Sequence, residues 1–316
     1  MGIPTTQKAA VVEQPGPDAQ CVVEEIPVPT PNDGEILVKV NWSGLCHSDV
    51  HLIGAGWASM GVNMKAKVSG HEGAGVVVAV GKNWVSDTCG HCGFCTNGFD
   101  ELHCTQQTNS GASTEGTFQQ YVTTSAQYAT KIPDGVSDEE AGPILCGGVT
   151  AYTALKRSAV RPGQWVVLPG AGGGLGHLAI QYAKAMGMRV IAIDGGKEKE
   201  ELCKRLGAEV YIDFLVEDIP AKVMELTTYG AHGVVVTAAS RAAYEMAPNL
   251  LPPHGTLVCV GLPEDDFRDV EEALDFTARG LVKPILVTGT INDINTFVDK
   301  MVAGQLPGRA VINLWA

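Results

Sequence analysis

The chain has 316 residues, of which 45% are hydrophobic and 18% charged, and its formal net charge is −13. This length is enough for two domains with separate cores, and the composition excludes a disordered chain. The acidic balance argues against a general binder of nucleic acids or anionic membranes, although a local site can still hold a small anionic cofactor. The apolar runs are too short to span a bilayer, so we expect a soluble, cytoplasmic protein.

Short apolar segments in the first part of the chain, separated by turns with proline and glycine, predict a β-rich unit. The first three segments are residues 8–13, 21–29 and 35–44. Residues 114–132 predict further strands, and residues 151–158 predict a helix.

Two motifs in this unit carry residues suited to metal binding. Residues 46–51, CHSDVH, combine one cysteine with two histidines, which suits zinc binding or catalysis. A buried cysteine beside surface histidines explains these residues equally well. Residues 70–75, GHEGAG, surround His71 and Glu72 with glycines that let the backbone approach a ligand. Glu72 suits a metal ligand or a residue that orients one.

The most specific motif is the cysteine cluster Cys89, Cys92, Cys95 and Cys104. Two overlapping C-x-x-C turns and a later cysteine can supply four thiolates to one zinc ion, and a closed set of four is typical of structural sites. His103 could replace Cys104 as the fourth ligand, and a redox C-x-x-C is the alternative function. The chain has nine cysteines, and this odd number indicates metal binding in a reducing compartment rather than a disulfide framework.

Strands and helices alternate from Trp165 onward and predict a doubly wound parallel Rossmann sheet, so the fold class is α/β. The expected strands are 165–168, 190–194, 210–214, 233–238 and 256–261, and the expected helices between them are 175–186, 197–206, 219–227 and 241–251. Beyond residue 261 we expect a helix over 270–280, a segment at 285–288 that could form an edge strand, a helix over 294–303 and a strand over 310–313.

A glycine-rich stretch joins the first expected strand of this sheet to the helix that follows it. Its glycines are Gly170, Gly172, Gly173, Gly174 and Gly176. Such a turn leaves backbone N–H groups at a helix N-terminus, which favours a pyrophosphate. Asp194 ends the next strand, where its carboxylate can bind a ribose and repel a 2′-phosphate. The stretch therefore predicts a dinucleotide site that prefers NAD over NADP. Glycines required only by a tight turn are the alternative explanation.

These motifs together resemble the zinc-dependent medium-chain alcohol dehydrogenases of the yeast and fungal type, over essentially the whole chain. The resemblance also rests on PILCGGVT at 143–150, QYAKAMG at 181–187 and EALDFTARGLVK at 272–283. It implies a GroES-like catalytic domain over residues 1–154 and 265–316, and an NAD-binding domain over residues 155–264. The chain lacks segments that the family has after Asn83 and near Asp266.

The resemblance implies roles for individual residues. The expected ligands of a catalytic zinc ion are Cys46, His71 and Cys146, with Glu72 as the acid that can approach the metal. Ser48 and His51 would bind the substrate alcohol and pass on its proton, and Trp57 and Trp84 would narrow the substrate pocket. The expected cofactor contacts come from the glycine-rich stretch with Leu175, and from His47, Thr150, Asp194, Lys199 and Arg309.

The implied activity is that of an oxidoreductase that transfers hydride between a small primary alcohol or aldehyde and NAD, with two zinc ions per chain. A homo-oligomer is expected from the family, although the segment missing near Asp266 forms much of the family's subunit interface. Because of the missing segments, the alternative is an impaired zinc-binding homologue that does not bind NAD productively. A zinc-ribbon binder of nucleic acids is disfavoured by the acidic charge and the lack of a basic stripe.

Overall fold

The computed structural model describes residues 2–58, 61–82, 107–260, 279–306 and 308–316, together with Cys92, Cys95, Cys104 and Thr277. Its contacts divide the chain into two compact units. Unit 1 contains residues 1–146 and 286–316, and unit 2 contains residues 147–285. The C-terminal segment therefore returns to the N-terminal unit. The domain limits expected at 154 and 264 remain a prediction.

Unit 1 is built on a mixed sheet around β3 (Glu35–Leu45). On one side β3 pairs antiparallel with β4 (Glu72–Val80); on the other it pairs with β5 (Tyr121–Ser125) and, further along, with β12 (Arg309–Asn313). β11 (Leu286–Thr290) lies parallel to β12 at the sheet edge. A separate antiparallel pair contains β1 (Thr6–Val11) and β2 (Val22–Pro27). The β-rich unit expected from the sequence is confirmed.

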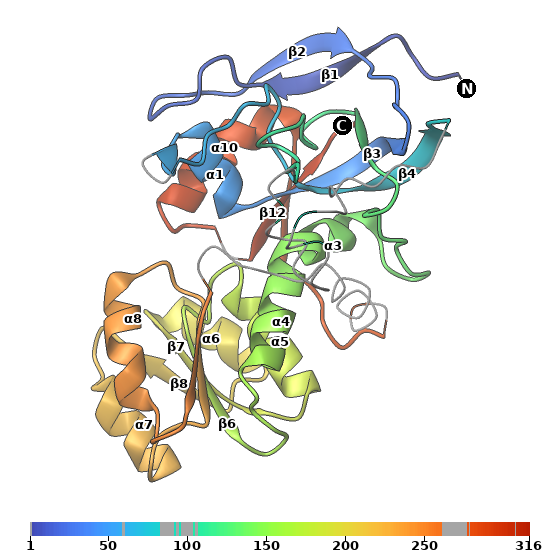
Figure 1. Ribbon diagram of the computed structural model, residues 1–316. Coiled ribbons are helices and arrows are strands. Elements are labelled where there is room, and N and C mark those ends of the chain that lie inside the picture. Colours follow the sequence, from blue (N-terminus) through green and yellow to red (C-terminus); the bar gives the residue numbers. More distant parts are fainter. Residues whose placement is uncertain are drawn as a thin grey trace. The chain divides into compact units, whose positions relative to one another are not determined.

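Two helices cover the core of unit 1. They are α1 (His47–Ile53) and α10 (Ile294–Val302), which lie side by side although they are far apart in the sequence (Figure 1). The short helix η5 (Ile291–Asp293) precedes α10. Leu52 of α1 and Phe297 of α10 pack with Val40 of β3 in one buried cluster. The core therefore holds α1, which carries most of the first motif of the candidate site.

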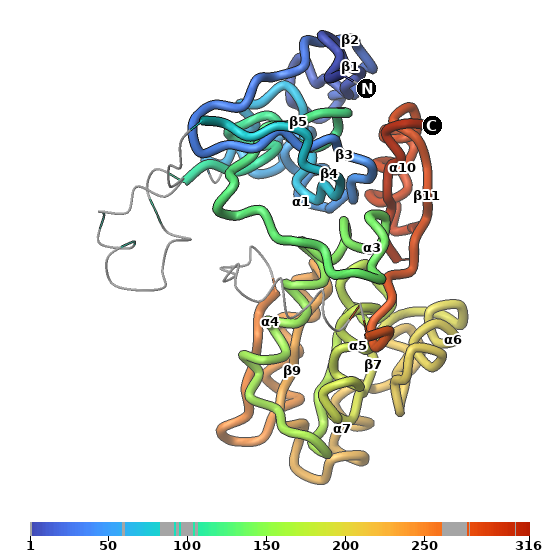
Figure 2. The backbone as a smooth tube through the Cα atoms, turned by 90° about the vertical axis from the view of Figure 1, so that its right-hand side faces the viewer, coloured from blue at the N-terminus to red at the C-terminus, as the bar shows by residue number. Residues whose placement is uncertain are grey.

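Unit 2 contains a five-stranded parallel sheet in the order β10-β9-β6-β7-β8. Its strands are β6 (Trp165–Pro169), β7 (Arg189–Asp194), β8 (Val210–Asp213), β9 (Gly233–Val236) and β10 (Thr256–Cys259). The α-helices whose bounds lie within its described residues are α4 (Val149–Arg157), α5 (Gly176–Ala185), α6 (Lys197–Leu206), α7 (Ile219–Thr227) and α8 (Arg241–Met246), most of them labelled in Figure 2. α5 packs between α4 and α6. The α/β fold class is confirmed.

The structure differs from the expected elements at two places. The helix expected over 241–251 ends at Met246 and continues as the 3-10 helix η4 (Ala247–Leu250), because Pro248 has no N–H to donate. The segment at 285–288 forms β11, but β11 joins β12 in unit 1 and does not extend the sheet of unit 2. The helix expected over 270–280 lies largely outside the described residues.

Within the described part of the chain, no helix has both the length and the apolar character needed to cross a bilayer.

Candidate active site

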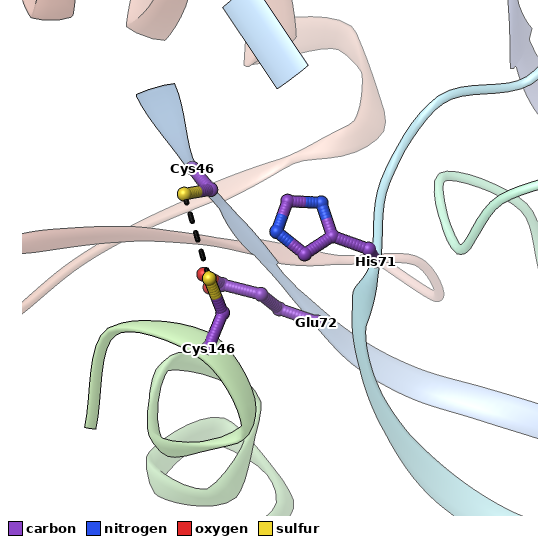
Figure 3. Close-up of side chains that lie close together, drawn as sticks. All are labelled: Cys46, His71, Glu72 and Cys146. Carbon is purple, nitrogen blue, oxygen red and sulfur yellow. Dashed lines mark hydrogen bonds between the residues drawn. The ribbon is translucent and has the colours of Figure 1, made fainter. Parts of the chain in front are cut away.

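Four side chains with metal-binding groups lie together in unit 1 (Figure 3): Cys46, His71, Glu72 and Cys146. Their candidate ligand atoms all lie within 4.8 Å of one another, and the two sulfur atoms are 3.7 Å apart. Cys46 follows β3, and His71 and Glu72 lie at the start of β4. Cys146 lies in the π-helix η3 (Ile144–Gly148), between α3 (Asp138–Pro143) and α4. The fold therefore brings together three segments that are distant in the sequence.

The donor atoms of this group fit a zinc ion. Two thiols and one imidazole are typical zinc ligands. The hydrogen bond with Cys146 lowers the pKa of Cys46 well below its ordinary value, helped by Arg309 and His71 and opposed by burial. A lowered thiol pKa favours the thiolate, which is the form that binds metal. One carboxylate oxygen of Glu72, Oε2, is buried and finds no hydrogen-bond partner among the described residues, which a nearby cation would compensate.

Asp49 is a residue of this site that the sequence analysis missed. Its carboxylate is fully buried, and Oδ1 lies 2.9 Å from Nδ1 of His71, so Nε2 of His71 remains for a metal. Its Oδ2 accepts a hydrogen bond of 2.9 Å from the backbone N–H of Cys46. Burial lowers the pKa of His71, but the charge and hydrogen bond of Asp49 outweigh it and raise the pKa well above its ordinary value. An acid three positions after the N-cap residue of a helix is a capping signal, which points to the hydrogen bond that Asp49 accepts from the N–H of Cys46 but not to its contact with His71.

Glu72 and Arg309 form a buried ion pair beside the cysteines. Nη2 of Arg309 donates to Oε1 of Glu72, and the two residues are 5% and 0% exposed. Burial raises the pKa of Glu72 to about 7, against the opposing charge of Arg309. Gly44 leaves room for this pair, because a Cβ at Gly44 would lie 1.9 Å from Oε2 of Glu72. The structure places Arg309 against Glu72, and its expected contact with a pyrophosphate remains a prediction.

The other residues expected around the substrate lie on α1 or just after it. The hydroxyl of Ser48 is 3.7 Å from the sulfur of Cys46. The ring of His51 stacks on Trp57, with centroids 4.7 Å apart, and it lies 4.9 Å from the ring of His47. Burial lowers the pKa of His51, and His47 adds to this shift, so the neutral imidazole is favoured. Trp84 lies outside the described residues.

A second group of cysteines contains Cys92, Cys95 and Cys104, whose sulfur atoms lie within 4.8 Å of one another. The sulfur atoms of Cys92 and Cys95 are 3.4 Å apart, and no disulfide joins the described cysteines. Three clustered thiols fit a structural zinc ion. Cys89 and His103 lie outside the described residues, so the fourth ligand remains a prediction.

Three of the features expected at the dinucleotide site, the glycine-rich loop, Asp194 and Lys199, lie at the carboxyl ends of β6 and β7 in unit 2. Because β6 and β7 are parallel neighbours, the glycine-rich loop after β6 lies next to Asp194 at the end of β7. Oδ2 of Asp194 accepts the N–H of Gly172 at 2.8 Å, and Oδ1 lies 2.8 Å from Nζ of Lys199. Thr150 is buried in α4. Hydrogen bonds thus connect the loop, Asp194 and Lys199. The contacts that these residues and Thr150 would make with a cofactor remain predictions.

The glycines of this loop meet two different backbone requirements. Gly170 has a φ of 84°, a conformation that other residues rarely adopt. A Cβ on Gly176 would lie 2.2 Å from the carbonyl oxygen of Gly170, so only glycine lets α5 begin this close to the loop. In the described part of the chain, the N–H groups of Gly174 and Leu175 have no backbone acceptor. These two N–H groups therefore remain without a backbone hydrogen bond at the start of α5, in the part of the chain that the structure describes.

Comparisons with known proteins agree with the description of both units. Residues 32–134 match the family model of the alcohol dehydrogenase GroES-like domain, and residues 174–302 match that of the zinc-binding dehydrogenases. The chain is 41% identical to alcohol dehydrogenase 1 of Emericella nidulans over 353 aligned positions, which cover 99% of both proteins. The chain belongs to the zinc-dependent alcohol dehydrogenases. This family member is also 40% identical to the alcohol dehydrogenase of Schizosaccharomyces pombe, with 99% of both chains covered.

Solved structures of related proteins share the whole fold of this alcohol dehydrogenase family member. An acetophenone reductase from Geotrichum candidum in complex with NAD has a TM-score of 0.83 at 26% identity, covering 100% of this chain and 99% of its own. An alcohol dehydrogenase from Aeropyrum pernix has a TM-score of 0.84 at 27% identity, covering 97% and 100%. The alignment with the Emericella nidulans protein is longer, at 353 positions, than the 316 residues of this chain. The relative therefore has residues that this chain lacks, in agreement with the internal gaps inferred from the sequence.

Proposed function

We propose that this protein is an NAD-dependent alcohol dehydrogenase that interconverts a small primary alcohol and its aldehyde. The observation that carries the proposal is the set of Cys46, which is buried, with His71 and Cys146, which are partly buried, and the buried Glu72 carboxylate beside them. Three protein ligands leave one position of a tetrahedral zinc ion for a substrate, whereas closed sets of four cysteines are structural. The ion would supply Lewis acidity toward the substrate oxygen. The relatives named alcohol dehydrogenase support the same activity.

The residues around this set have the chemistry to handle the alcohol proton. The hydroxyl of Ser48 lies next to the sulfur of Cys46, where it can bind the hydroxyl of a substrate. His51 has a lowered pKa, so at neutral pH its imidazole can accept a proton. Trp57 stacks on His51 and would limit the size of the substrate. Asp49 holds His71 in one orientation, as groups bonded to metal-ligating histidines do.

NAD would bind at the carboxyl edge of the unit 2 sheet. The amides of Gly174 and Leu175 would bind the pyrophosphate at the start of α5, which is also the positive end of that helix. Asp194, with Lys199 beside it, would bind the adenosine ribose. The acetophenone reductase of the same fold was solved with NAD, which supports this cofactor. Contacts from His47, Thr150 and Arg309 belong to the same proposal.

The interpretation as an impaired remnant has no support in the comparisons, because the chain aligns over nearly its full length with enzymes. We also propose a cytoplasmic location, since the described cysteines form no disulfide and suit a reducing compartment. The homo-oligomer expected from the family remains a proposal.

The proposed activity can be tested directly on purified protein of known zinc content. NADH fluorescence measures cofactor binding, and NADH formation from NAD with a series of primary alcohols measures turnover. Two zinc ions per chain, NADH binding and alcohol-dependent turnover are the expected results. Zinc without NADH binding or turnover would refute the proposal in favour of the impaired homologue.

The preference for NAD can be tested by Asp194→Asn. We expect the ratio of kcat/KM for NAD to that for NADP to fall by roughly tenfold to a hundredfold, because a charge repulsion near the surface is worth a few kcal/mol. The asparagine oxygen can still accept the N–H of Gly172, and Lys199 becomes available to a 2′-phosphate. Asp218→Asn, at the N-cap of α7, is the matched control and should leave the ratio unchanged. An unchanged ratio in Asp194→Asn would remove Asp194 from this role.

A further inference from the structure

His177 lies in the first turn of α5 and is fully buried. Its Nε2 accepts a hydrogen bond of 3.2 Å from the backbone N–H of Ile285. Since an amide N–H only donates, Nε2 carries no proton, and the proton of the neutral ring is on Nδ1. Nδ1 lies 3.1 Å from the carbonyl oxygen of Gly173 and therefore donates to it. One imidazole in a fixed tautomer thus connects the glycine-rich loop to Ile285.

Gln181, one turn further along α5, holds the same segment. Its Oε1 accepts the N–H of Lys283 and its Nε2 donates to the carbonyl of Lys283, both at 3.0 Å. Residues 282–285 belong to no helix or strand, and Val282 is fully buried. Two side chains of α5 therefore provide hydrogen bonds that regular structure does not supply here. Ile285 is the last residue of unit 2, and β11 begins with the next residue.

We infer that His177 is a positioning residue for the dinucleotide, because its Nδ1–H holds the carbonyl of Gly173 while Ile285 fixes the ring and its tautomer. The same carbonyl also accepts the backbone N–H of His177 at 3.0 Å. The peptide that follows this carbonyl carries the N–H of Gly174, so the orientation of Gly173 sets the direction of an amide proposed to bind pyrophosphate. This inference rests on the proposed binding of NAD at the loop.

The two ring nitrogens can be tested separately. In His177→Asn, the amide NH₂ lies near the position of Nδ1 and can donate to Gly173, but no acceptor reaches Ile285. In His177→Gln, the amide oxygen can lie near the position of Nε2 and accept from Ile285, but the bond to Gly173 is lost. His177→Leu removes both bonds. Gln181→Met removes the contacts with Lys283 without removing the bond to Gly173, so it is the control for a loosened segment.

Two measurements on the zinc-loaded full chain separate these contacts. Amide hydrogen exchange without cofactor should be faster over residues 283–286 in His177→Leu, His177→Asn and Gln181→Met, and near wild type in His177→Gln. The Kd for NADH, from fluorescence, should rise about tenfold in His177→Leu and His177→Gln, a change of about 1.4 kcal/mol, because the Gly173 carbonyl loses one of its two hydrogen bonds. It should stay near wild type in His177→Asn and Gln181→Met. The Tm of each variant shows whether affinity merely follows stability.

The outcomes distinguish this inference from the proposed function. If the wild-type protein binds NADH but His177→Asn and His177→Gln have equal Kd values, the positioning role alone is overturned. The same holds if the Kd values of the variants simply follow their Tm values. A wild-type protein that does not bind NADH would overturn the proposed cofactor site and the positioning role with it. Recovery of NADH binding in His177→Asn, at a Tm no higher than that of His177→Gln, supports the inference.

Discussion

Replacing Cys46 with alanine is expected to remove one zinc ion per chain and to abolish alcohol turnover. His71 and Cys146 would still offer one imidazole and one thiol, and the Glu72 carboxylate is held in its ion pair with Arg309, so too few ligands remain for a stable tetrahedral site. Lewis-acid activation is worth several kcal/mol, so its loss should lower kcat/KM by at least about a thousandfold. NADH binding should persist, because the glycine-rich loop and Asp194 belong to unit 2 and Cys46 belongs to unit 1.

Metal analysis and kinetics on the same samples check this result. Cys259→Ser is the matched control, because Cys259 is exposed and belongs to neither cysteine group. It should retain both zinc ions and full turnover. If Cys46→Ala keeps two zinc ions per chain, the assignment of the catalytic ligands is wrong. If it loses the ion but keeps turnover, the ion at this site does not take part in the reaction.

The helices whose bounds are predicted best from the sequence have start and stop signals that lie within a few neighbouring residues. The helices expected at 197–206 and 219–227 coincide with α6 and α7. α6 ends where Gly207 takes a φ of 112°, and α7 begins after Asp218, whose side chain accepts the N–H of Ala221. The helix expected up to residue 251 is too long, because Pro248 has no N–H for the α-helical hydrogen bond and the chain continues as a 3-10 helix. Local stop and start signals therefore decide how well boundaries can be predicted.

Contacts between distant residues could not be predicted in the same way. The apolar pattern at 285–288 indicates a strand but does not say which sheet it joins, and β11 lies beside β12 in unit 1. Asp49 meets His71, which is 22 positions away, and His177 meets Ile285, which is 108 positions away. A buried polar side chain finds its partner only after the chain has folded. For this reason the motifs gave the candidate metal ligands, but not the residues that orient them.

The second large effect, a loss of stability, is expected from Arg309→Met. This change leaves the carboxylate of Glu72 buried without its counter-charge, and breaking a buried ion pair on one side costs about 3–5 kcal/mol. Each kcal/mol changes Tm by about 2–4 °C in a domain of this size, so we expect Tm to fall by about 6–20 °C. The double variant Glu72→Gln with Arg309→Met removes both charges and should recover much of this loss.

An exposed ion pair provides the control for this experiment. Arg241 and Glu245 pair on the surface of α8 with side chains 91% and 62% exposed, so Arg241→Met should cost less than about 1 kcal/mol. Equal Tm changes in Arg309→Met and Arg241→Met would show that burial of the Glu72 pair adds nothing to stability. An NADH titration of Glu72→Gln and of the double variant tests the proposed pyrophosphate contact separately. Only the double variant lacks the guanidinium, so only it should bind NADH more weakly if Arg309 contacts the cofactor.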